Sequence, residues 1–249
     1  MKIGIVGWGV ETQSAYRYFG PDHSYVIGNE EPRDDFPNEP NVELHYLDIK
    51  RDPGLVGNAV DLHYLDHYDA CDVIIFQGAA RKNLEKKFPA NHSFWMRAKT
   101  TLDIFFELMP RERIIGVTGT KGKGTTSSLI YEMIRAADIP AVIGGNIGIP
   151  VLDLLPHIDQ STWVVLELSS FQLYKFAYSP HIAVNLMMIP EHIAEWHKTM
   201  DDYVEAKRNI FLHQDAEDIA IYLGTNEHSL SNAAYSPGKK IPYFAAPGA

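Results

Sequence analysis

Short apolar runs alternate with segments of helical periodicity along the whole chain. Strand-like runs are found at 2–6, 25–27, 42–47, 73–76, from 114, and at 141–143, 163–168, 182–187 and 218–223. Continuous apolar runs such as Val73–Phe76 are typical of strands that are buried on both faces of a parallel sheet. Strands that alternate with helical segments predict two doubly wound α/β units, and hence an α/β fold class.

Helical segments are expected between these runs. The pattern predicts a helix that ends near residue 19, a helix over 91–109 that Pro110 ends, and a helix over about 200–213. Residues 28–41 are rich in Pro, Asp, Glu and Asn and predict a loop. We expect the boundary between the units near residues 100–112, and we divide the chain into domains at 1–100 and 101–249.

The strongest motif is a glycine-rich loop between the strand that starts at 114 and a helical segment. Residues 116–126 read Gly-Val-Thr-Gly-Thr-Lys-Gly-Lys-Gly-Thr-Thr. Small residues let backbone N–H groups surround phosphate oxygens, and the N-terminus of the next helix favours an anion. The general P-loop pattern has Gly where this chain has Val117, and Ser or Thr where it has Gly124, so the match is imperfect. A glycine-rich turn with an incidental lysine is the alternative. The candidate nucleotide-binding residues are Gly119, Thr120, Lys121, Gly122, Lys123, Gly124, Thr125 and Thr126.

A weaker glycine motif lies near the N-terminus. Residues 7–12 read Gly-Trp-Gly-Val-Glu-Thr, in which Thr12 replaces the last glycine of a dinucleotide-binding fingerprint. Glu11 brings a negative charge to the place where a phosphate would lie. Three interpretations stay open: a contact to a nucleotide sugar through Val10 and Glu11, a nicotinamide dinucleotide site, and a structural turn.

Two further residues follow strands of the second unit. Glu167 ends the apolar run Trp163–Leu166, at the edge where open α/β sheets bind ligands, and a carboxylate beside a phosphate loop is a Mg²⁺ ligand. The alternative is a surface carboxylate. His192 follows the strand 182–187, and a single histidine there is either a metal ligand or structural.

Lys207 lies within the helix predicted over 200–213. Tyr203, Ile210 and Phe211 stand at i−4, i+3 and i+4 from it, so the lysine shares their apolar face. A lysine on such a face must extend to solvent, pair with another group or take part in chemistry. Residues 144–148, Gly-Gly-Asn-Ile-Gly, follow another strand, and Asn146 is either a ligand contact or part of a tight connection.

Composition narrows the range of partners. The chain has 249 residues, of which 45% are hydrophobic, and 22 Lys and Arg against 32 Asp and Glu give a net charge of −10. Such a charge disfavours a nucleic-acid or anionic-membrane surface. The single cysteine, Cys71, permits no intrachain disulfide, suits a reducing compartment and is interpreted as buried and inert. We expect a cytoplasmic monomer that binds neither nucleic acid nor membrane.

Four segments together resemble the Mur ligases of peptidoglycan synthesis, and among them the D-glutamate-adding ligases. They are 117–123 (Val-Thr-Gly-Thr-Lys-Gly-Lys), 144–150 (Gly-Gly-Asn-Ile-Gly-Ile-Pro), 166–173 (Leu-Glu-Leu-Ser-Ser-Phe-Gln-Leu) and 203–211 (Tyr-Val-Glu-Ala-Lys-Arg-Asn-Ile-Phe). The resemblance is strong over about 110–215 and topological over 1–100. It implies a Rossmann-like domain that binds the UDP substrate, followed by a P-loop ATP-binding domain.

The resemblance also implies roles for individual residues. Lys123 would contact the phosphates of ATP, and Asn146, Ser169 and Gln172 would lie near the muramoyl-peptide substrate. Thr125 or Thr126 together with Glu167 would hold one Mg²⁺, and His192 would help to hold a second. Lys207 stands where the family carries a carbamylated lysine that serves as an anionic Mg²⁺ ligand. Lys123, Glu167, His192 and Lys207 are therefore the expected catalytic residues.

The implied reaction uses ATP and Mg²⁺ to join D-glutamate to UDP-N-acetylmuramoyl-L-alanine through an acyl-phosphate. A folylpolyglutamate synthase is the first alternative: Gly124 after Lys123 favours it, and segments 144–148 and 169–173 oppose it. A non-catalytic nucleotide-binding module is the second. Family members have three domains, so the end of the ATP domain and the whole C-terminal domain are expected to be missing here. The chain alone is expected to be inactive.

Overall fold

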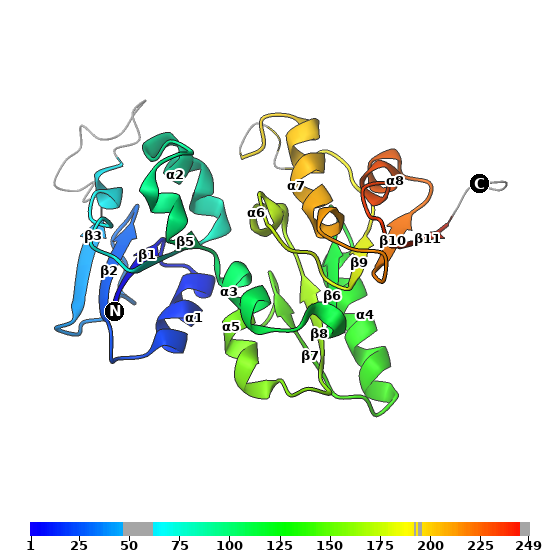
Figure 1. Cartoon of the computed structure of the whole chain (residues 1–249), viewed down its shortest axis with the longest axis horizontal. Coiled ribbons are helices and arrows are strands. Elements are labelled where there is room, and N and C mark those ends of the chain that lie inside the picture. The colour runs from blue at the N-terminus through cyan, green and yellow to red at the C-terminus, as the bar shows by residue number, and fades with distance from the viewer. Residues whose placement is uncertain (47–61, 192, 194–195, 245–249) are drawn as a thin grey trace. The chain divides into compact units, whose positions relative to one another are not determined.

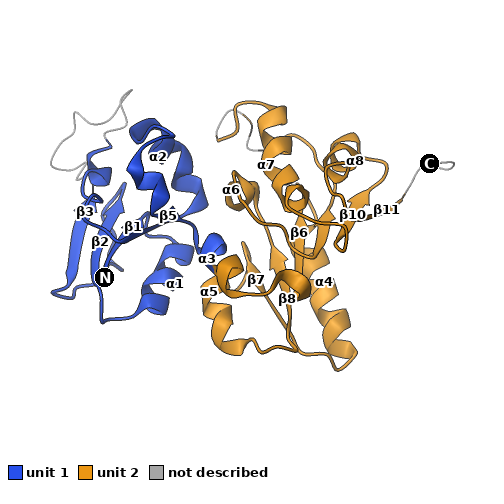
Figure 2. Cartoon of the chain, in the orientation of Figure 1, with its two compact units in different colours: residues 1–104 blue, residues 105–249 orange. Residues whose placement is uncertain are grey.

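The computed structural model describes residues 1–46, 62–191, 193 and 196–244. It divides into two compact units, Met1–Ile104 and Phe105–Ala249 (Figure 2). In each unit the described strand pairs are parallel and helices pack on the sheet (Figure 1). This is the predicted α/β architecture. Within the part of the chain that the structure describes, no helix is long and apolar enough to cross a bilayer.

The first unit has a five-stranded sheet with the order β3-β2-β1-β4-β5. Its strands are β1 (Lys2–Val6), β2 (Ser24–Asn29), β3 (Val42–Tyr46), β4 (Val73–Phe76) and β5 (Ala98–Lys99). Its helices are α1 (Val10–Phe19), α2 (Arg81–Lys87), the start of α3 (Thr101–Leu108), and the 3₁₀ helices η2 (His63–Leu65), η3 (Gly78–Ala80) and η4 (Ser93–Met96). Chain order reverses between β1 and β4, where a doubly wound sheet leaves a crevice for ligands.

The predicted helix over 91–109 is wrong in its first half. The structure places η4, β5 and then α3 there, and Thr100 caps α3 by accepting a hydrogen bond from the Asp103 amide at 3.1 Å. Tertiary contacts explain the difference. Phe94 is buried and stacks on Phe88 with ring centroids 4.1 Å apart. The Arg97 guanidinium donates to backbone carbonyls that include Cys71 O, so this segment folds around the core instead of continuing as a helix.

The second unit has a six-stranded sheet with the order β11-β10-β9-β6-β8-β7. Its strands are β6 (Ile114–Thr118), β7 (Ala141–Gly145), β8 (Trp163–Glu167), β9 (Ile182–Asn185), β10 (Ile219–Leu223) and β11 (Lys239–Tyr243). Its helices are α4 (Lys123–Ala136), α5 (Val151–Leu154), α6 (Ser170–Leu173), α7 (Met200–Leu212), α8 (Glu227–Ala233), and the 3₁₀ helices η5 (Arg111–Arg113) and η6 (Leu155–His157). The central strand β6 lies between β8 and β9, so the loop that follows β6 is next to the ends of both.

Residues of each sheet form an apolar cluster with neighbouring residues of the same unit. In the second unit, residues of β6, β8 and β9 pack with Ile130 and Ile134 of α4. In the first unit, Cys71 is buried beside Tyr68 and Ile74. Burial raises the pKa of the Cys71 thiol to about 11, which keeps it protonated and unreactive at neutral pH. The prediction of a buried, inert cysteine therefore agrees with the structure.

Candidate functional site

The glycine-rich loop connects β6 to the N-terminus of α4. Gly119 and Gly122 have φ values of +146° and +86°, which side-chain-bearing residues rarely adopt. A Cβ on Gly119 would also lie 2.7 Å from the Cβ of Leu186, so there is no room for a larger residue. Strand, loop and helix are therefore arranged as the sequence predicts, with backbone N–H groups at the start of a 14-residue helix.

Thr120 fixes the crown of this loop to the chain that follows β9. Its backbone N–H donates to Met187 O at 2.8 Å. Its hydroxyl donates to Ile189 O at 3.0 Å, accepts from the Ile189 amide at 3.0 Å and lies 3.0 Å from the Tyr203 hydroxyl of α7. Sequence analysis assigned Thr120 to nucleotide binding, but its side chain is engaged in holding the loop in place.

The two lysines of the loop have different partners. Lys123 begins α4, and its ammonium donates to Gly119 O and Thr120 O at 3.1 and 3.0 Å, which holds the charge at the loop. Lys121 is 64% exposed and forms an ion pair with Glu191 at 2.6 Å. Only Lys123 is therefore placed to add a positive charge beside the backbone N–H groups.

Glu167 ends β8 and is 3% exposed. Its Oε1 accepts a hydrogen bond from Asn146 Nδ2 at 2.8 Å, and the Asn146 amide donates to Glu167 O at 2.9 Å. On its other side, a Cβ added to Gly124 would lie 3.1 Å from Oε2. The buried carboxylate is thus at the first turn of α4, and the segment 144–148 holds it there.

The position that faces Glu167 carries no hydroxyl. Gly124 is that position, and successive residues on an α-helix point about 100° apart, so Thr125 projects in a different direction. Thr125 is exposed and Thr126 is half-buried in this first turn. Their assignment to the metal and to the nucleotide stays a prediction.

Lys207 is buried on the core-facing side of α7, as predicted from its spacing. Tyr203, Lys207, Ile210 and Phe211 are each at most 1% exposed. The Lys207 ammonium donates to Thr118 Oγ1 at 3.1 Å and lies 4.8 Å from the centre of the Tyr203 ring.

The electrostatic surroundings of Lys207 connect it to the loop. Burial, and next the positive charge of Lys123, lower the pKa of Lys207 from its ordinary value of 10.5 to about 7; the charges of Glu191 and Glu167 act in the opposite direction. A substantial fraction of the side chain is therefore a neutral amine at neutral pH. Loop lysine, carboxylate and buried lysine interact in one region of the second unit.

Ser169 and Gln172 cap α6. The Gln172 amide donates to Ser169 Oγ at 3.3 Å, and Gln172 Oε1 accepts from the Ser169 amide at 2.9 Å. This is a capping box, and the Ser-x-x-Gln spacing in the sequence is its signature. The predicted substrate contacts of the two residues stay predictions, since both side chains have a structural role here.

Sequence analysis missed a buried pair in the same unit. His197 Nε2 lies 2.9 Å from the Ser170 hydroxyl, and His197 is 1% exposed. The two residues are 27 positions apart, so no local pattern announces the pair. His192, the predicted metal ligand, lies outside the described residues.

The N-terminal glycine motif forms a compact turn after β1. The Thr12 hydroxyl donates to Gly7 O at 2.6 Å and also accepts from the Gly9 amide at 3.1 Å. A Cβ on Gly9 would lie 2.3 Å from the Gln77 amide oxygen, so Gln77, at the end of β4, covers the turn. Gln77 was not among the predicted site residues, although the sequence shows that it directly follows the apolar strand 73–76.

Val10 and Glu11, which were predicted to contact a nucleotide sugar, lie in the first turn of helix α1. Val10 is 65% exposed, and Glu11 is half-buried. Buried Thr12 closes the loop in the place of the expected glycine. The turn therefore has a clear structural role, and the assignment of Val10 and Glu11 to a nucleotide sugar stays a prediction.

The contact between Asn146 and Glu167 leads to a stability prediction. Asn146→Ala should lower the free energy of unfolding by about 1–2 kcal/mol without metal, because a buried carboxylate loses a hydrogen-bond donor. For a chain of this size that is a fall in Tm of about 3–6 °C. Saturating Mg²⁺ should reduce the deficit, since a cation at Glu167 replaces the lost donor. Thermal unfolding of both proteins with and without MgCl₂ measures this, and a deficit that Mg²⁺ leaves unchanged would contradict a cation at Glu167.

Comparisons with known proteins identify the family of the chain. The family of Mur ligase middle domains matches residues 117–245. A UDP-N-acetylmuramoylalanine–D-glutamate ligase from Acetivibrio thermocellus is 37% identical over 182 residues, which cover 73% of this chain and 38% of that protein. The enzyme of the same name from Clostridium botulinum is 29% identical over 220 residues, 88% of this chain and 46% of that protein. The chain therefore spans less than half the length of these relatives.

A solved structure shares the fold. The UDP-N-acetylmuramate:L-alanyl-gamma-D-glutamyl-meso-diaminopimelate ligase from Neisseria meningitides superposes with a TM-score of 0.55 at 15% identity, covering 96% of this chain and 77% of that one. The family match covers more than half of the chain and includes the glycine-rich loop from Val117 onward, Glu167 and Lys207. The chain belongs to the Mur ligase family.

Proposed function

We propose that the second unit binds Mg²⁺·ATP for a ligase of peptidoglycan synthesis that adds D-glutamate to UDP-N-acetylmuramoyl-L-alanine. The observation that carries the proposal is the meeting of three groups at the start of α4: the glycine loop, the Lys123 ammonium and the buried Glu167 carboxylate. A triphosphate needs N–H donors and a cation, and a divalent metal needs an oxygen anion. These residues fit both.

Each group has a distinct task in phosphoryl transfer. The loop amides and Lys123 would hold the outer phosphates and stabilise the charge that develops as the phosphoryl group leaves ADP. Glu167 would hold a Mg²⁺, with Asn146 orienting its carboxylate through the 2.8 Å hydrogen bond. The metal, when bound, offsets the repulsion between the substrate carboxylate and the triphosphate. The substrate carboxylate would attack the γ-phosphate of ATP, with ADP as the leaving group, to give an acyl-phosphate. The amino group of D-glutamate would then displace phosphate from it to form the amide, with loss of a proton from the nitrogen.

Lys207 fits a carbamylated role. Its lowered pKa leaves neutral amine, and a neutral amine adds CO₂ to give a carbamate with release of one proton. The product would be an anion on a side chain that is 1% exposed as the unmodified lysine, so a nearby cation is needed to offset its burial. A Mg²⁺ in this region supplies one, and Lys207 would change from a group that repels the metal into one that binds it.

The choice of D-glutamate rests on similarity. The relatives with 37% and 29% identity carry the name of the D-glutamate ligase. The residue at 124 favours the folylpolyglutamate synthases, because a glycine after the lysine is found there. Segments 144–148 and 169–173, in contrast, resemble the D-glutamate-adding ligases and favour addition of D-glutamate.

Calorimetry on the whole chain tests the proposal. We expect Mg²⁺·ATP to bind, Glu167→Gln to weaken binding by about 10-fold or more, and Glu132→Gln, an exposed change on α4, to have no effect. UDP-N-acetylmuramoyl-L-alanine should bind as well, whereas a folate monoglutamate should not. Absence of ATP binding at millimolar concentrations would overturn the nucleotide site, and binding of the folate instead would favour the alternative family.

A further inference from the structure

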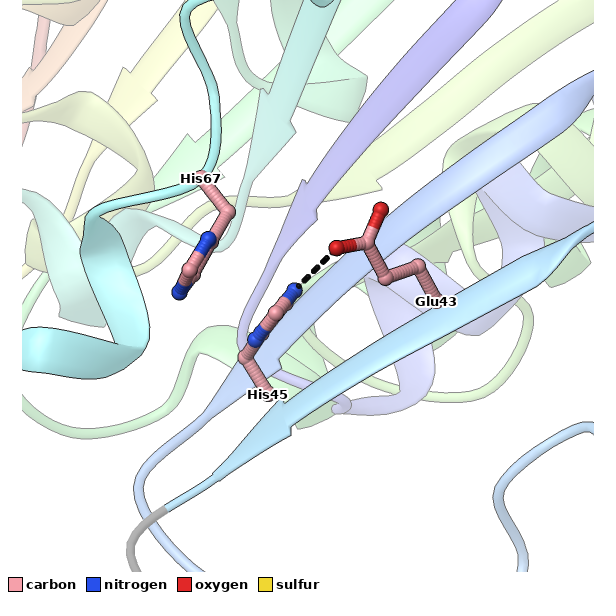
Figure 3. A group of neighbouring side chains, drawn as sticks. All are labelled: Glu43, His45 and His67. Carbon is pink, nitrogen blue, oxygen red and sulfur yellow. Dashed lines mark hydrogen bonds and ion pairs between the residues drawn. The ribbon is translucent and has the colours of Figure 1, made fainter.

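Two histidines and a glutamate gather on one face of the first unit. Glu43 and His45 lie two residues apart on β3, the strand at the end of the described sheet, so their side chains point to the same face. His67 comes from the chain between η2 and β4. Figure 3 shows the three side chains converging from these two segments.

The contacts within this group are close. His45 Nε2 lies 2.9 Å from Glu43 Oε1, and the rings of His45 and His67 stack with centroids 3.5 Å apart and planes 9° apart (Figure 3). One ligand atom from each of the three residues lies within 4.8 Å of the others.

The fold holds the two segments together independently of this cluster. His45 pairs in register with Gly28 of β2, and paired residues face the same side of a sheet. A Cβ on Gly28 would lie 2.3 Å from the Tyr68 hydroxyl, so the chain around Tyr68 packs directly on that face. Tyr68 is buried and donates to Ile5 O at 2.9 Å. His67, its neighbour, is thereby placed over His45 by the core and not by the surface contact itself.

We propose that Glu43, His45 and His67 form a binding site for a borderline divalent cation of the Zn²⁺ class. Two imidazoles and one carboxylate are the donor set that such cations prefer, whereas Mg²⁺ prefers oxygen ligands throughout. This site belongs to the first unit and has no part in the ATP site proposed for the second. Three protein ligands leave a position for water.

Binding requires two local changes. A cation between Glu43 and His45 takes the place of an Nε2 proton: in a neutral ring that proton moves to Nδ1, and in an imidazolium one proton is released. The rings must also turn out of their parallel stack, because lone pairs in parallel planes do not converge on one point about 2 Å from each nitrogen. His67 is exposed, so its side chain has room to turn. The ammonium of Lys2, 3.5 Å from Glu43 Oε2, is on the other carboxylate oxygen and does not occupy the shared one.

The consequence is a link between the strand β3 and the chain after η2. Without metal the contact of this cluster between the two segments is the ring stack of His45 on His67, since the hydrogen bond of His45 to Glu43 lies within β3. A bound cation would join them by coordinate bonds and would stabilise the folded unit by an amount that grows with the logarithm of the free metal concentration above Kd.

Titration of the metal-free whole chain with ZnCl₂ tests the site. Calorimetry in the presence of millimolar MgCl₂, which occupies oxygen sites, should give one high-affinity event, and Tm should rise with Zn²⁺. His67→Gln and Glu43→Gln alter exposed side chains and should each weaken Zn²⁺ binding by about 100-fold or more. The Tm increase should disappear with the affinity.

His63→Gln is the matched control, because His63 is an exposed histidine four residues from His67 that is paired with Asp66 instead. It should bind Zn²⁺ like the unmodified chain. Equal Zn²⁺ affinity in the unmodified chain, His67→Gln and Glu43→Gln would overturn the proposal, as would the absence of any event tighter than millimolar. Loss of binding in His63→Gln but not in His67→Gln would place the site elsewhere and also overturn it.

Discussion

Replacing Lys123 by alanine should weaken the binding of Mg²⁺·ATP about 100-fold. The ammonium is held at the loop by Gly119 O and Thr120 O, next to the N-terminus of α4, where the outer phosphates of a nucleotide would lie. A hydrogen bond to a charged group contributes about 1.5–3 kcal/mol, and the upper part of that range corresponds to about 100-fold in affinity. Calorimetric titration of the purified variant with Mg²⁺·ATP measures the change.

Lys121→Ala is the matched control. It removes the same charge from the same loop, but its ammonium is on the exposed side in an ion pair with Glu191. Exposed ion pairs contribute about 0–1 kcal/mol, so its effect on ATP affinity should stay below about 5-fold. Equal losses in the two variants would show that general attraction, and not the placement of Lys123, accounts for nucleotide binding.

Lys207→Met should stabilise the chain at pH 6, on the order of 3 kcal/mol. The lysine is 1% exposed, and burial is the main cause of its pKa of about 7 in the folded state. Below pH 7 the folded chain must bury the charged form, which opposes folding. Between pH 7 and about 10.5 the unfolded chain binds a proton that the folded chain does not, so the stability of the unmodified chain should rise with pH through this window.

Methionine carries no charge, so the variant should lack this rise. Denaturant unfolding at several pH values in CO₂-free buffer gives the free energy of unfolding of both proteins as a function of pH. The difference in stability between Lys207→Met and the unmodified chain should narrow as pH increases from 7 towards 10.5. Parallel curves would mean that Lys207 keeps its ordinary pKa. With bicarbonate and Mg²⁺ added, ¹³C NMR should detect a carbamate in the unmodified chain and not in Lys207→Met. Its absence would contradict the carbamylated role but not the pKa.

The sequence was most informative where one local rule decides the structure. The apolar runs predict the parallel strands correctly, because a strand that is buried on both faces is apolar at nearly every position. The face of α7 follows from spacing alone, and Lys207 is buried as predicted. The failure at residues 91–109 has the opposite origin. Phe94 and Arg97 make their contacts with the core and with distant carbonyls, and periodicity carries no information about such partners.

The candidate site divides in the same way. Motif and strand order placed the glycine loop and Glu167 at one edge of a sheet. They did not reveal that Asn146 donates to Glu167, or that Thr120 holds the loop. Both contacts join residues that are far apart in the sequence, and they depend on where each side chain points in the folded structure. The cap formed by Ser169 and Gln172 was within reach of the sequence, since the Ser-x-x-Gln spacing is local. The two residues were instead predicted to contact substrate, because their segment resembles a substrate-binding segment of the family.

The attachment of Thr120 to Met187, Ile189 and Tyr203 has a thermodynamic consequence for anion binding. A loop that becomes ordered only when its ligand arrives loses conformational entropy, which reduces affinity. Here the crown of the loop is already immobilised by side-chain and backbone bonds on two sides. A phosphate that binds at this loop would meet preorganised N–H groups, so the binding of even inorganic pyrophosphate would carry no entropic cost for ordering the loop. Binding heats for pyrophosphate and ATP should accordingly lack the large unfavourable entropy that accompanies the folding of a segment.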